Sequence, residues 1–420
     1  MSLDEIRTAR QELDDTIAEI RTVPGFEDFL AAPTFEDVAE AAEQTPLVYL
    51  AAAVPGGLAL IVRGEDVRDV ALDDLTEAEL RERVHRHLGT YDAYRRDPEG
   101  GRPGWVESLD ELCAWLWDVV MEPVLGELER ASGAALVTGG LLGMLPLHAA
   151  WTHDRAKPTG RRYALDALSL SYAPNARSLS VARARANEGK GRALVVAEPR
   201  PVTGATLPCA ALEAEVVAAA FPDSPTLLSG GTATPRNFAT GATAADVLHL
   251  ACHGLADLAE PLESGLRLAG DRAVTLRDMM GMDLQVRLAV LSACETSLPG
   301  TELPDEVVAL PTGLLQAGVA GVVASLWSVP DRATAMLMTD FYRRWRWERV
   351  APAQALRDAQ VWLRDTTNEE KRSLWEGADG AKWLPLRVAD AFLRATAFLE
   401  PDARDHATIP AWGAFTHVGA

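Results

Sequence analysis

The chain has 420 residues, of which 48% are hydrophobic and 24% are charged. At about 150 residues per domain, this length predicts two or three domains, and the composition excludes a disordered chain. Its 40 basic and 61 acidic residues give a formal charge of −21, and a surface of that sign repels nucleic-acid phosphates and anionic lipid headgroups. We therefore expect a protein that binds neither nucleic acid nor membrane.

The cysteines favour neither a disulfide framework nor a CxxC zinc site, because they are few and widely spaced. They are Cys113, Cys209, Cys252 and Cys294. The N-terminal segment is charged throughout and lacks the apolar core of a signal peptide, and no run approaches the ~18 apolar residues of a spanning helix. We expect a soluble cytoplasmic protein whose cysteines are reduced.

Residues 1–45 are expected to form a helical lead. Ser2 and Glu5 have capping-box spacing, and isoleucine and leucine residues then recur at helical intervals. A Pro-Gly pair at 24–25 breaks the pattern before a second helix at 34–43.

Residues 46–188 are expected to form a first half with strands and helices. Strands are predicted at 46–54 and 57–64, helices at 75–96 and 106–130, and short apolar runs follow at 134–140 and 164–174.

Residues 189–420 are expected to form a second half, and a polar linker at 183–191 marks its start. Apolar runs at 192–198, 246–254, 286–294 and 319–327 alternate with helical patterns. Continuous Val, Leu and Ala strands bounded by helices indicate a mostly parallel sheet that is covered on both faces. The fold class is therefore α/β.

Two of the expected strand ends carry residues suited to nucleophilic catalysis. His253 and Gly254 follow the run DVLHLAC, and Cys294 follows VRLAVLSA. Ligands bind at the carboxyl ends of parallel strands, and adjacent strands lie ~4.8 Å apart, so the two side chains can meet across one crevice. A thiolate is a nucleophile, and an imidazole can accept its proton and later protonate a leaving amine. The backbone N–H groups of Gly254 and Cys294 are candidate oxyanion donors.

Other interpretations of these residues carry less weight. A single cysteine or histidine at a strand end is most often a buried core residue, and Cys252 is expected to pack on the opposite face of its strand. A zinc site is disfavoured because positions 249 and 253 lie ~13 Å apart along a strand. The sequence has neither a phosphate-binding glycine loop nor the GxSxG motif of serine hydrolases. We expect no metal and no cofactor.

Several blocks of the sequence together match one known family. HLACHG (249–254), VLSACETS (290–297) and the segment 305–345, which begins with DEVVALPTGLLQAG, occur in this order. They resemble the CHAT family of caspase-like cysteine peptidases, which shares a superfamily with caspases, separases and gingipains. GLLGMLPLHAAW (140–151) and IPAWGAFTHVG (409–419) are similar to further landmarks of that family. The resemblance implies a caspase-like three-layer fold in which a pseudo-caspase half at 46–188 precedes a catalytic half at 189–420.

The resemblance also implies roles for individual residues. His253 is implied as the catalytic base and Cys294 as the nucleophile, with Gly254 and the Cys294 amide as the oxyanion hole. A P1 pocket beside the cysteine is implied as well, and Trp327 is a candidate wall of it. Acidic residues in the matched region make a basic P1 residue conceivable, although such residues also cap helices. These acidic residues are Glu295, Asp305, Glu306 and Asp331.

We expect a cysteine endopeptidase that hydrolyses one protein partner through a thioester on Cys294. The resemblance implies antiphage defence or programmed cell death as its context, with a bacterial gasdermin or another defence protein as substrate. A separate activating partner is compatible with this hypothesis. The rival hypotheses are a catalytically silent scaffold with a caspase-like fold and, with less support, an acyltransferase that uses the same thiol.

Overall fold

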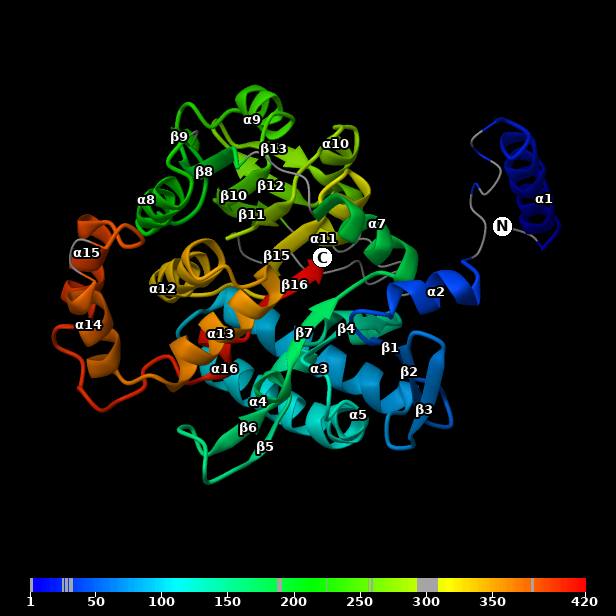
Figure 1. The fold of residues 1–420 in the computed structure, drawn as a ribbon, viewed down its shortest axis with the longest axis horizontal. Coiled ribbons are helices and arrows are strands. Elements are labelled where there is room, and N and C mark those ends of the chain that lie inside the picture. Colours follow the sequence, from blue (N-terminus) through cyan, green and yellow to red (C-terminus); the bar gives the residue numbers. More distant parts are fainter. Residues whose placement is uncertain are drawn as a thin grey trace.

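The structure is a computed structural model that describes residues 3–24, 26, 29, 33–186, 191–223, 225–255, 257, 260–292, 309–378 and 381–420. In this part of the chain, helices cover both faces of one large sheet (Figure 1). The α/β class expected from the sequence is confirmed.

The large sheet has eleven strands among the described residues, in the order β3-β2-β1-β4-β7-β16-β15-β14-β10-β8-β9. The strands are β1 (Leu47–Ala51), β2 (Gly57–Arg63), β3 (Asp66–Leu72), β4 (Gly133–Thr138), β7 (Ser169–Tyr172), β8 (Ala193–Pro199), β9 (Pro225–Gly230), β10 (Val247–Ala251), β14 (Leu288–Val290), β15 (Gly321–Ser325) and β16 (Phe415–Gly419).

Most neighbouring strands of this sheet are parallel. From β9 across to β15, each strand pairs in parallel with the next. The strands expected at 46–54 and 57–64 form as β1 and β2 and pair antiparallel, and β3, which was not expected, extends this pair antiparallel. The last strand, β16, lies antiparallel to β15 and parallel to β7. The end of the chain therefore joins the strands of the two expected halves into one sheet, while the domain boundaries themselves stay a prediction.

Two smaller sheets accompany the large one. One has β11 (His253–Leu255), β12 (Gly265–Leu268) and β13 (Arg272–Thr275), and the other has β5 (Trp151–His153) and β6 (Arg161–Tyr163). The run 246–254, expected as a single strand, thus ends as β10 at Ala251 and continues as β11 of another sheet.

The helices before β8 are α1 (Leu3–Ile20), α2 (Phe35–Ala41), α3 (Glu77–Arg96), α4 (Arg102–Leu116), α5 (Glu122–Glu127), α6 (Ala164–Ala167) and α7 (Ala176–Ala186). Those after it are α8 (Ala210–Ala220), α9 (Pro235–Ala242), α10 (Leu276–Met280), α11 (Leu310–Gln316), α12 (Asp331–Tyr342), α13 (Pro352–Asp365), α14 (Asn368–Gly377), α15 (Leu386–Thr396) and α16 (Ile409–Trp412). In Figure 1, α1 stands apart from the sheet.

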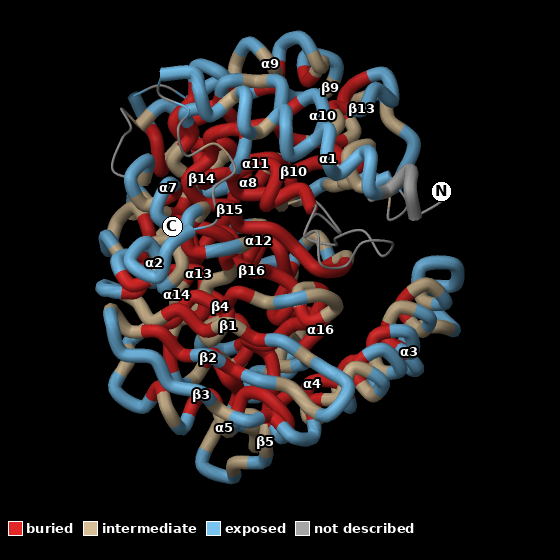
Figure 2. The backbone as a smooth tube through the Cα atoms, turned by 90° about the vertical axis from the view of Figure 1, so that its right-hand side faces the viewer, coloured by how far each residue is buried: buried red, intermediate tan, exposed pale blue. Residues whose placement is uncertain are grey.

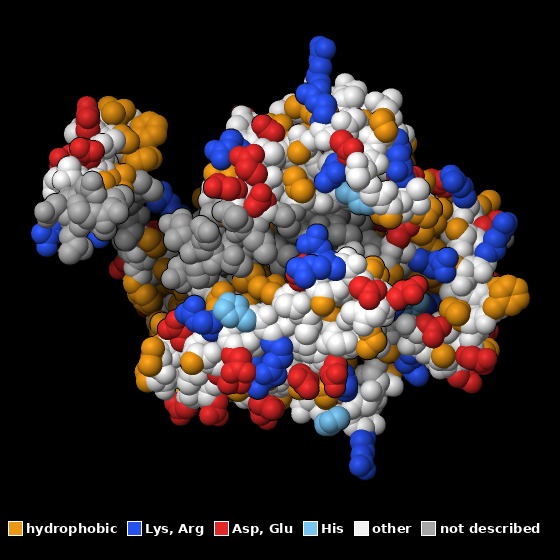
Figure 3. Space-filling model, turned by 180° about the vertical axis from the view of Figure 1, so that it is seen from behind, with side chains coloured by type: hydrophobic (Ala, Val, Ile, Leu, Met, Phe, Trp, Pro, Cys, Tyr) orange, Lys and Arg blue, Asp and Glu red, His pale blue; other side chains and the backbone are white. Residues whose placement is uncertain are grey.

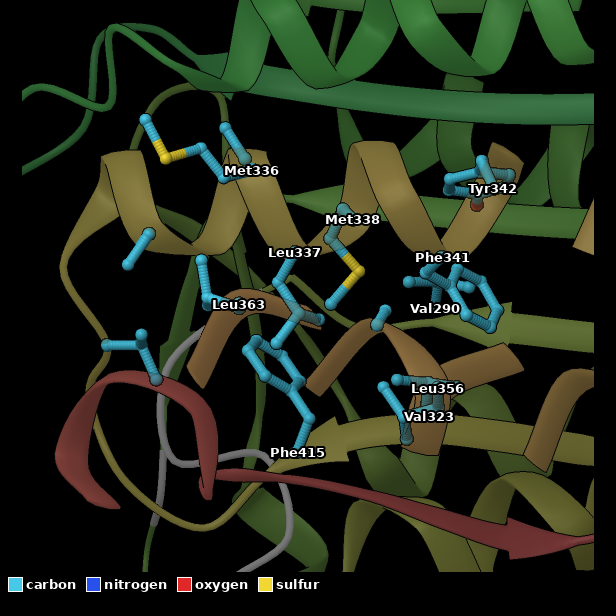
Figure 4. Packing of buried hydrophobic residues seen from close by; sticks show 14 of the residues in the cluster. Val290, Val323, Met336, Leu337, Met338, Phe341, Tyr342, Leu356, Leu363 and Phe415 are labelled. Atoms are coloured by element: carbon cyan, nitrogen blue, oxygen red, sulfur yellow. The ribbon is translucent and has the colours of Figure 1, made fainter. Parts of the chain in front are cut away.

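Strand alternation divides the core of the second half between the two faces of the sheet. In β8, Ala193 and Val195 pack toward α8, α12 and α13, whereas Leu194 and Val196 pack toward α9, α10 and α11. Figure 2 shows buried backbone through the centre of the molecule and exposed backbone along its outer helices. Figure 4 shows how side chains of α12 and α13 meet those of the strands: Val290, Val323, Met336, Leu337, Met338, Phe341, Tyr342, Leu356, Leu363 and Phe415.

Candidate functional site

The carboxyl ends of four neighbouring strands place polar side chains at one edge of the sheet. The strands β8, β10, β14 and β15 are parallel neighbours, so their ends lie at the same edge. Glu198 lies near the end of β8, His253 follows β10 by two residues, and Ser292 follows β14. Ser325 is the last residue of β15. This edge is where the sequence analysis places the crevice.

His253 is partly exposed and is held by a backbone carbonyl. Its Nε2 lies 2.9 Å from the carbonyl oxygen of Ala205. A carbonyl oxygen only accepts hydrogen bonds, so Nε2 carries the hydrogen of the neutral ring and Nδ1 keeps the lone pair. The contact therefore selects one tautomer and leaves Nδ1 as the basic nitrogen.

The carbonyl that binds His253 belongs to residues 200–209, which we call the histidine loop. Gly204 has a φ of +135°, and a Cβ placed there would lie 3.0 Å from Nε2 of His253. The imidazole thus packs directly on the Gly204 backbone, an approach and a φ that favour glycine. Thr203 pins the loop to the β12–β13 turn, because its N–H and hydroxyl both donate to the Asp271 carboxylate, at 2.7 and 2.6 Å.

Glu198, which precedes the histidine loop, binds residues near both ends of that loop. Its Oε1 accepts from Nη2 of Arg200 at 2.6 Å and from the Leu207 N–H at 3.0 Å. The bond from Arg200 is the main reason that the pKa of Glu198 is held below its ordinary value, and the Leu207 N–H and a charge on His253 act in the same direction. Glu198 has a φ of +45°, which costs a non-glycine residue about 1 kcal/mol or more. These bonds offset that strain.

A narrow cavity, which we call the acid pocket, lies beside these strand ends and holds about 30 Å³. Two carboxylates reach it, from Glu213 of α8 and Asp331 of α12. Among the described residues, Oε2 of Glu213 and Oγ of Ser292 are buried without a hydrogen-bond partner. The other lining residues are Leu207, Ala210, Ala251, Cys252, Ser325, Val329, Thr334 and Phe415. Such a pocket fits a cationic group, because unpaired buried acceptors are costly until a donor reaches them.

A hydrogen bond inside the protein holds the Asp331 carboxylate, and the Glu213 carboxylate lies beside a buried histidine. Oδ2 of Asp331 accepts the Cys209 N–H at 2.8 Å. Burial raises the pKa of the Cys209 thiol to about 12, and a hydrogen bond to Asp331 adds to this shift. Oε2 of Glu213 lies 3.2 Å from Nε2 of the fully buried His249, without hydrogen-bond geometry. The Asp331 carboxylate is therefore held in place by the protein itself, whereas Oε2 of Glu213 still lacks a donor.

Three of the predicted residues other than His253 lie in the described part of the chain, and the others do not. Gly254 lies in β11, opposite Leu266 of β12, and Asp331 lines the acid pocket. Their roles in catalysis and substrate binding stay predictions. Trp327 is 1% exposed, and its indole N–H donates to the Pro410 carbonyl at 3.1 Å. Its role as a wall of the substrate pocket stays a prediction. The remaining predicted residues lie outside the described part of the chain: Cys294, Glu295, Asp305 and Glu306.

Several contributors to this site were not found by the sequence analysis. The carbonyl of Ala205 belongs to a backbone group, which leaves no mark in the sequence. Glu213 sits in an ordinary helical pattern, and the packing of α8 on β8, β10 and α12 brings it to the pocket. The signal that was available is Gly204, a glycine in a Pro- and Thr-rich segment directly after a strand.

The described residues contain no group of three or more His, Cys, Asp or Glu side chains that could hold a metal ion. Within the same ranges, no helix combines the length and the apolar character needed to cross a membrane. Cys252 is 2% exposed and packs with the cluster on the α9–α11 face, and its thiol is not in a disulfide.

Comparisons with known proteins agree with this geometry. Residues 110–420 match the family model of the CHAT domain. Two crystal structures of the Saccharomyces cerevisiae separase–securin complex resemble the fold with TM-scores of 0.54 and 0.52, each at 8% identity. The matches cover 91% and 77% of this chain but only 30% and 29% of the separase-complex chains. The caspase-like fold expected from the sequence is confirmed.

A crystal structure of the Arg-specific cysteine proteinase gingipain R matches with 11% identity and a TM-score of 0.42, over 72% of this chain and 67% of that chain. None of the curated protein sequences matches the chain.

Proposed function

Because the chain belongs to the CHAT family, we propose that it is a cysteine endopeptidase with His253 as general base and Cys294 as nucleophile. The caspase-like cysteine-protease fold supports a peptidase role. The observation that carries the proposal is the bond from His253 Nε2 to the Ala205 carbonyl, which leaves Nδ1 free to accept a proton.

In the proposed reaction, Nδ1 of His253 takes the proton of the Cys294 thiol, and the thiolate attacks the scissile carbonyl carbon. The N–H groups of Gly254 and Cys294 bind the oxyanion that forms. The imidazolium then protonates the leaving amine as the C–N bond breaks, which leaves a thioester on Cys294. His253 next deprotonates a water, whose attack on the thioester releases the second product and the Cys294 thiolate. The imidazolium then returns its proton to the thiolate, which regenerates the thiol and the neutral base.

We propose that the acid pocket receives a basic P1 side chain. It lies at the edge that carries His253, and Glu213 and Asp331 offer carboxylates to an ammonium or guanidinium group. Its volume of about 30 Å³ is the room of roughly one water molecule. A P1 side chain therefore enters only as the Leu207 side chain, which lines the pocket, turns aside.

The biological context follows the family resemblance. We propose that the enzyme acts in the cytoplasm on a partner protein in antiphage defence or programmed cell death, for example a bacterial gasdermin. An activating partner would supply the trigger.

The experiment that tests the proposal incubates the full chain with the proteins encoded by adjoining genes and reads cleavage sites by mass spectrometry. Wild type and Cys113→Ala are expected to release the same fragments, because Cys113 is buried in α4, away from the strand ends. Cys294→Ala and His253→Ala are expected to release none. Identical fragments from wild type and Cys294→Ala would contradict the mechanism. Stable association without cleavage would favour the scaffold.

A further inference from the structure

A second cavity, which we call the arginine cavity, lies away from the strand ends that carry His253 and holds about 930 Å³. Three segments form it: the start of α4, the turn into β6, and the chain that leads into α16. Its lining residues are Arg102, Pro103, Val106, Glu107, Asp110, Pro158, Thr159, Arg161, Tyr163, Arg404, Ala407, Thr408, Ile409 and Pro410. Its size falls in the range of small-molecule sites, about 300–1,000 Å³.

The arginine cavity is locally basic in an acidic chain. It has three arginines against two carboxylates, whereas the whole chain carries a charge of −21. Figure 3 shows acidic and basic side chains mixed over the rear face of the molecule. Asp110 is already neutralised, because Arg161 holds it with both terminal nitrogens and stacks 3.5 Å from the centre of the Trp151 ring. Arg102 and Arg404 then face one remaining carboxylate, Glu107, so the cavity keeps an excess of one positive charge.

These two guanidinium groups are free to bind a ligand. Nε of Arg404 donates to the Asp365 carbonyl at 2.6 Å, which fixes the side chain and leaves its two terminal nitrogens available. Arg102 is exposed, and no described residue forms a hydrogen bond or ion pair with its side chain. It is also the first residue of α4, a helix of 15 residues whose N-cap, Gly101, offers no side-chain cap. The positive end of this helix dipole adds to the attraction for an anion.

Apolar groups complete the walls of the arginine cavity. Pro103 and Val106 line it from α4, Pro158 from the turn into β6, and Ile409 and Pro410 from α16. Thr408 also lines it, and its side chain does not cap α16. A ligand that fits has an anionic group, which binds the guanidinium groups of Arg102 and Arg404, and an uncharged part, which packs against the apolar walls.

We propose that the arginine cavity binds a small phosphorylated molecule. Phosphate oxygens match the paired N–H groups of Arg102 and Arg404, and carboxylates share this chemistry. This site is separate from the proposed peptidase site, so the proposal goes beyond the peptidase function.

The arginine cavity is also connected to the acid pocket. The Pro410 carbonyl in its wall accepts the indole N–H of Trp327. Ser325 and Val329, two residues to either side of Trp327, line the acid pocket. A ligand that moves Pro410 therefore changes the position of Trp327 and, through it, the shape of the acid pocket. This second part of the proposal rests on the peptidase function.

The test measures binding by isothermal titration calorimetry on the full chain without substrate. The probes are ADP, inorganic pyrophosphate and citrate, with adenosine as the uncharged control. ADP or pyrophosphate is expected to bind more tightly than citrate, with one site per chain, and adenosine is expected to bind weakly. The double variant Arg102→Ala/Arg404→Ala is expected to lose at least about tenfold in affinity, since each lost bidentate contact costs about that factor.

The matched control is Arg277→Ala/Arg394→Ala, which removes two exposed arginines from α10 and α15. It is expected to bind as wild type does. Arg102→Glu provides a second variant at an exposed position, where the charge reversal is expected to abolish binding without unfolding. The proposal is overturned if neither ADP nor pyrophosphate binds at millimolar concentration, whether or not citrate does, or if both double variants bind equally. An acidic peptide that binds at this site while the small anions do not would also overturn it.

A separate readout follows the proposed coupling. If the anion binds but leaves KM for basic-P1 substrates unchanged, the result supports the anion site and contradicts the coupling through Trp327. Because the calorimetry uses no substrate, failure of the peptidase proposal leaves the binding result intact.

Discussion

At the scale of single residues, Asp331 performs two tasks with one carboxylate. It accepts the backbone N–H at the start of α8, and it presents charge to the acid pocket. The two tasks can be separated, because asparagine keeps an acceptor oxygen for the Cys209 N–H but loses the charge.

Asp331→Asn is expected to lower kcat/KM for peptides with arginine at P1 by about tenfold or more, since a hydrogen bond to a charged group is worth about 1.5–3 kcal/mol. Peptides with leucine at P1 are expected to be unaffected. The measurement is a matched pair of fluorogenic peptides, with Asp390→Asn, an exposed aspartate of α15, as the control. An equal loss for both peptides would show that Asp331 is structural only.

The sequence could predict individual residues of the site only where a motif marked them. Asp331 was predicted because it lies in a recognisable block; it lines the acid pocket, and its role in substrate binding stays a prediction. Glu213 was not, because a carboxylate in a helix is ordinarily exposed. Its burial against His249 depends on how α8 packs on the sheet.

At the scale of elements, the histidine loop holds the proposed base by backbone geometry. Gly204 allows the loop to lie on the imidazole, and Glu198 ties its two ends together. Sequence patterns located the strands β8 and β10 on either side of this contact. They could not predict the loop, because its path depends on two unusual backbone conformations, at Glu198 and Gly204.

Gly204→Ala is expected to displace His253, because the added methyl group would lie 3.0 Å from Nε2. We expect kcat to fall by at least about tenfold with little change in KM or in the circular-dichroism spectrum. Gly64→Ala is the control: Gly64 also has a positive φ, of +55°, but a Cβ there meets no atom within 4 Å. A loss of the same size in both variants would assign the effect to backbone strain alone.

At the scale of the whole molecule, β16 joins the two expected halves, and it carries a buried histidine. His417 pairs in register with Val323 of β15, is 2% exposed, and has no hydrogen-bond partner on either ring nitrogen among the described residues. Burial lowers its pKa from the ordinary 6.5 to about 4. Burial acts in the same way on His87, His148 and His406, whose pKa values are also about 4.

These histidines predict that the folded state loses stability as the pH falls from 6.5 toward 4. In this window the unfolded chain binds protons that the folded chain excludes, so the free energy of unfolding falls by about 1.4 kcal/mol per pH unit for each such histidine. His417→Leu is expected to flatten the slope of urea-unfolding free energy against pH, whereas replacing the exposed His153 is expected to leave it unchanged. A slope that is the same in both variants would contradict the assignment.

The most direct test of the central claim is covalent labelling of Cys294 by a peptidyl acyloxymethyl ketone with arginine at P1. Intact-mass and peptide mass spectrometry would follow the label at pH 7.5, in the presence of the activating partner where one is needed. We predict one label per chain, on Cys294, and at least about tenfold slower labelling in His253→Ala, in which the thiol lacks its base. Equal labelling rates in wild type and His253→Ala, or a label spread over Cys113, Cys209 and Cys252, would contradict a peptidase built on these two residues.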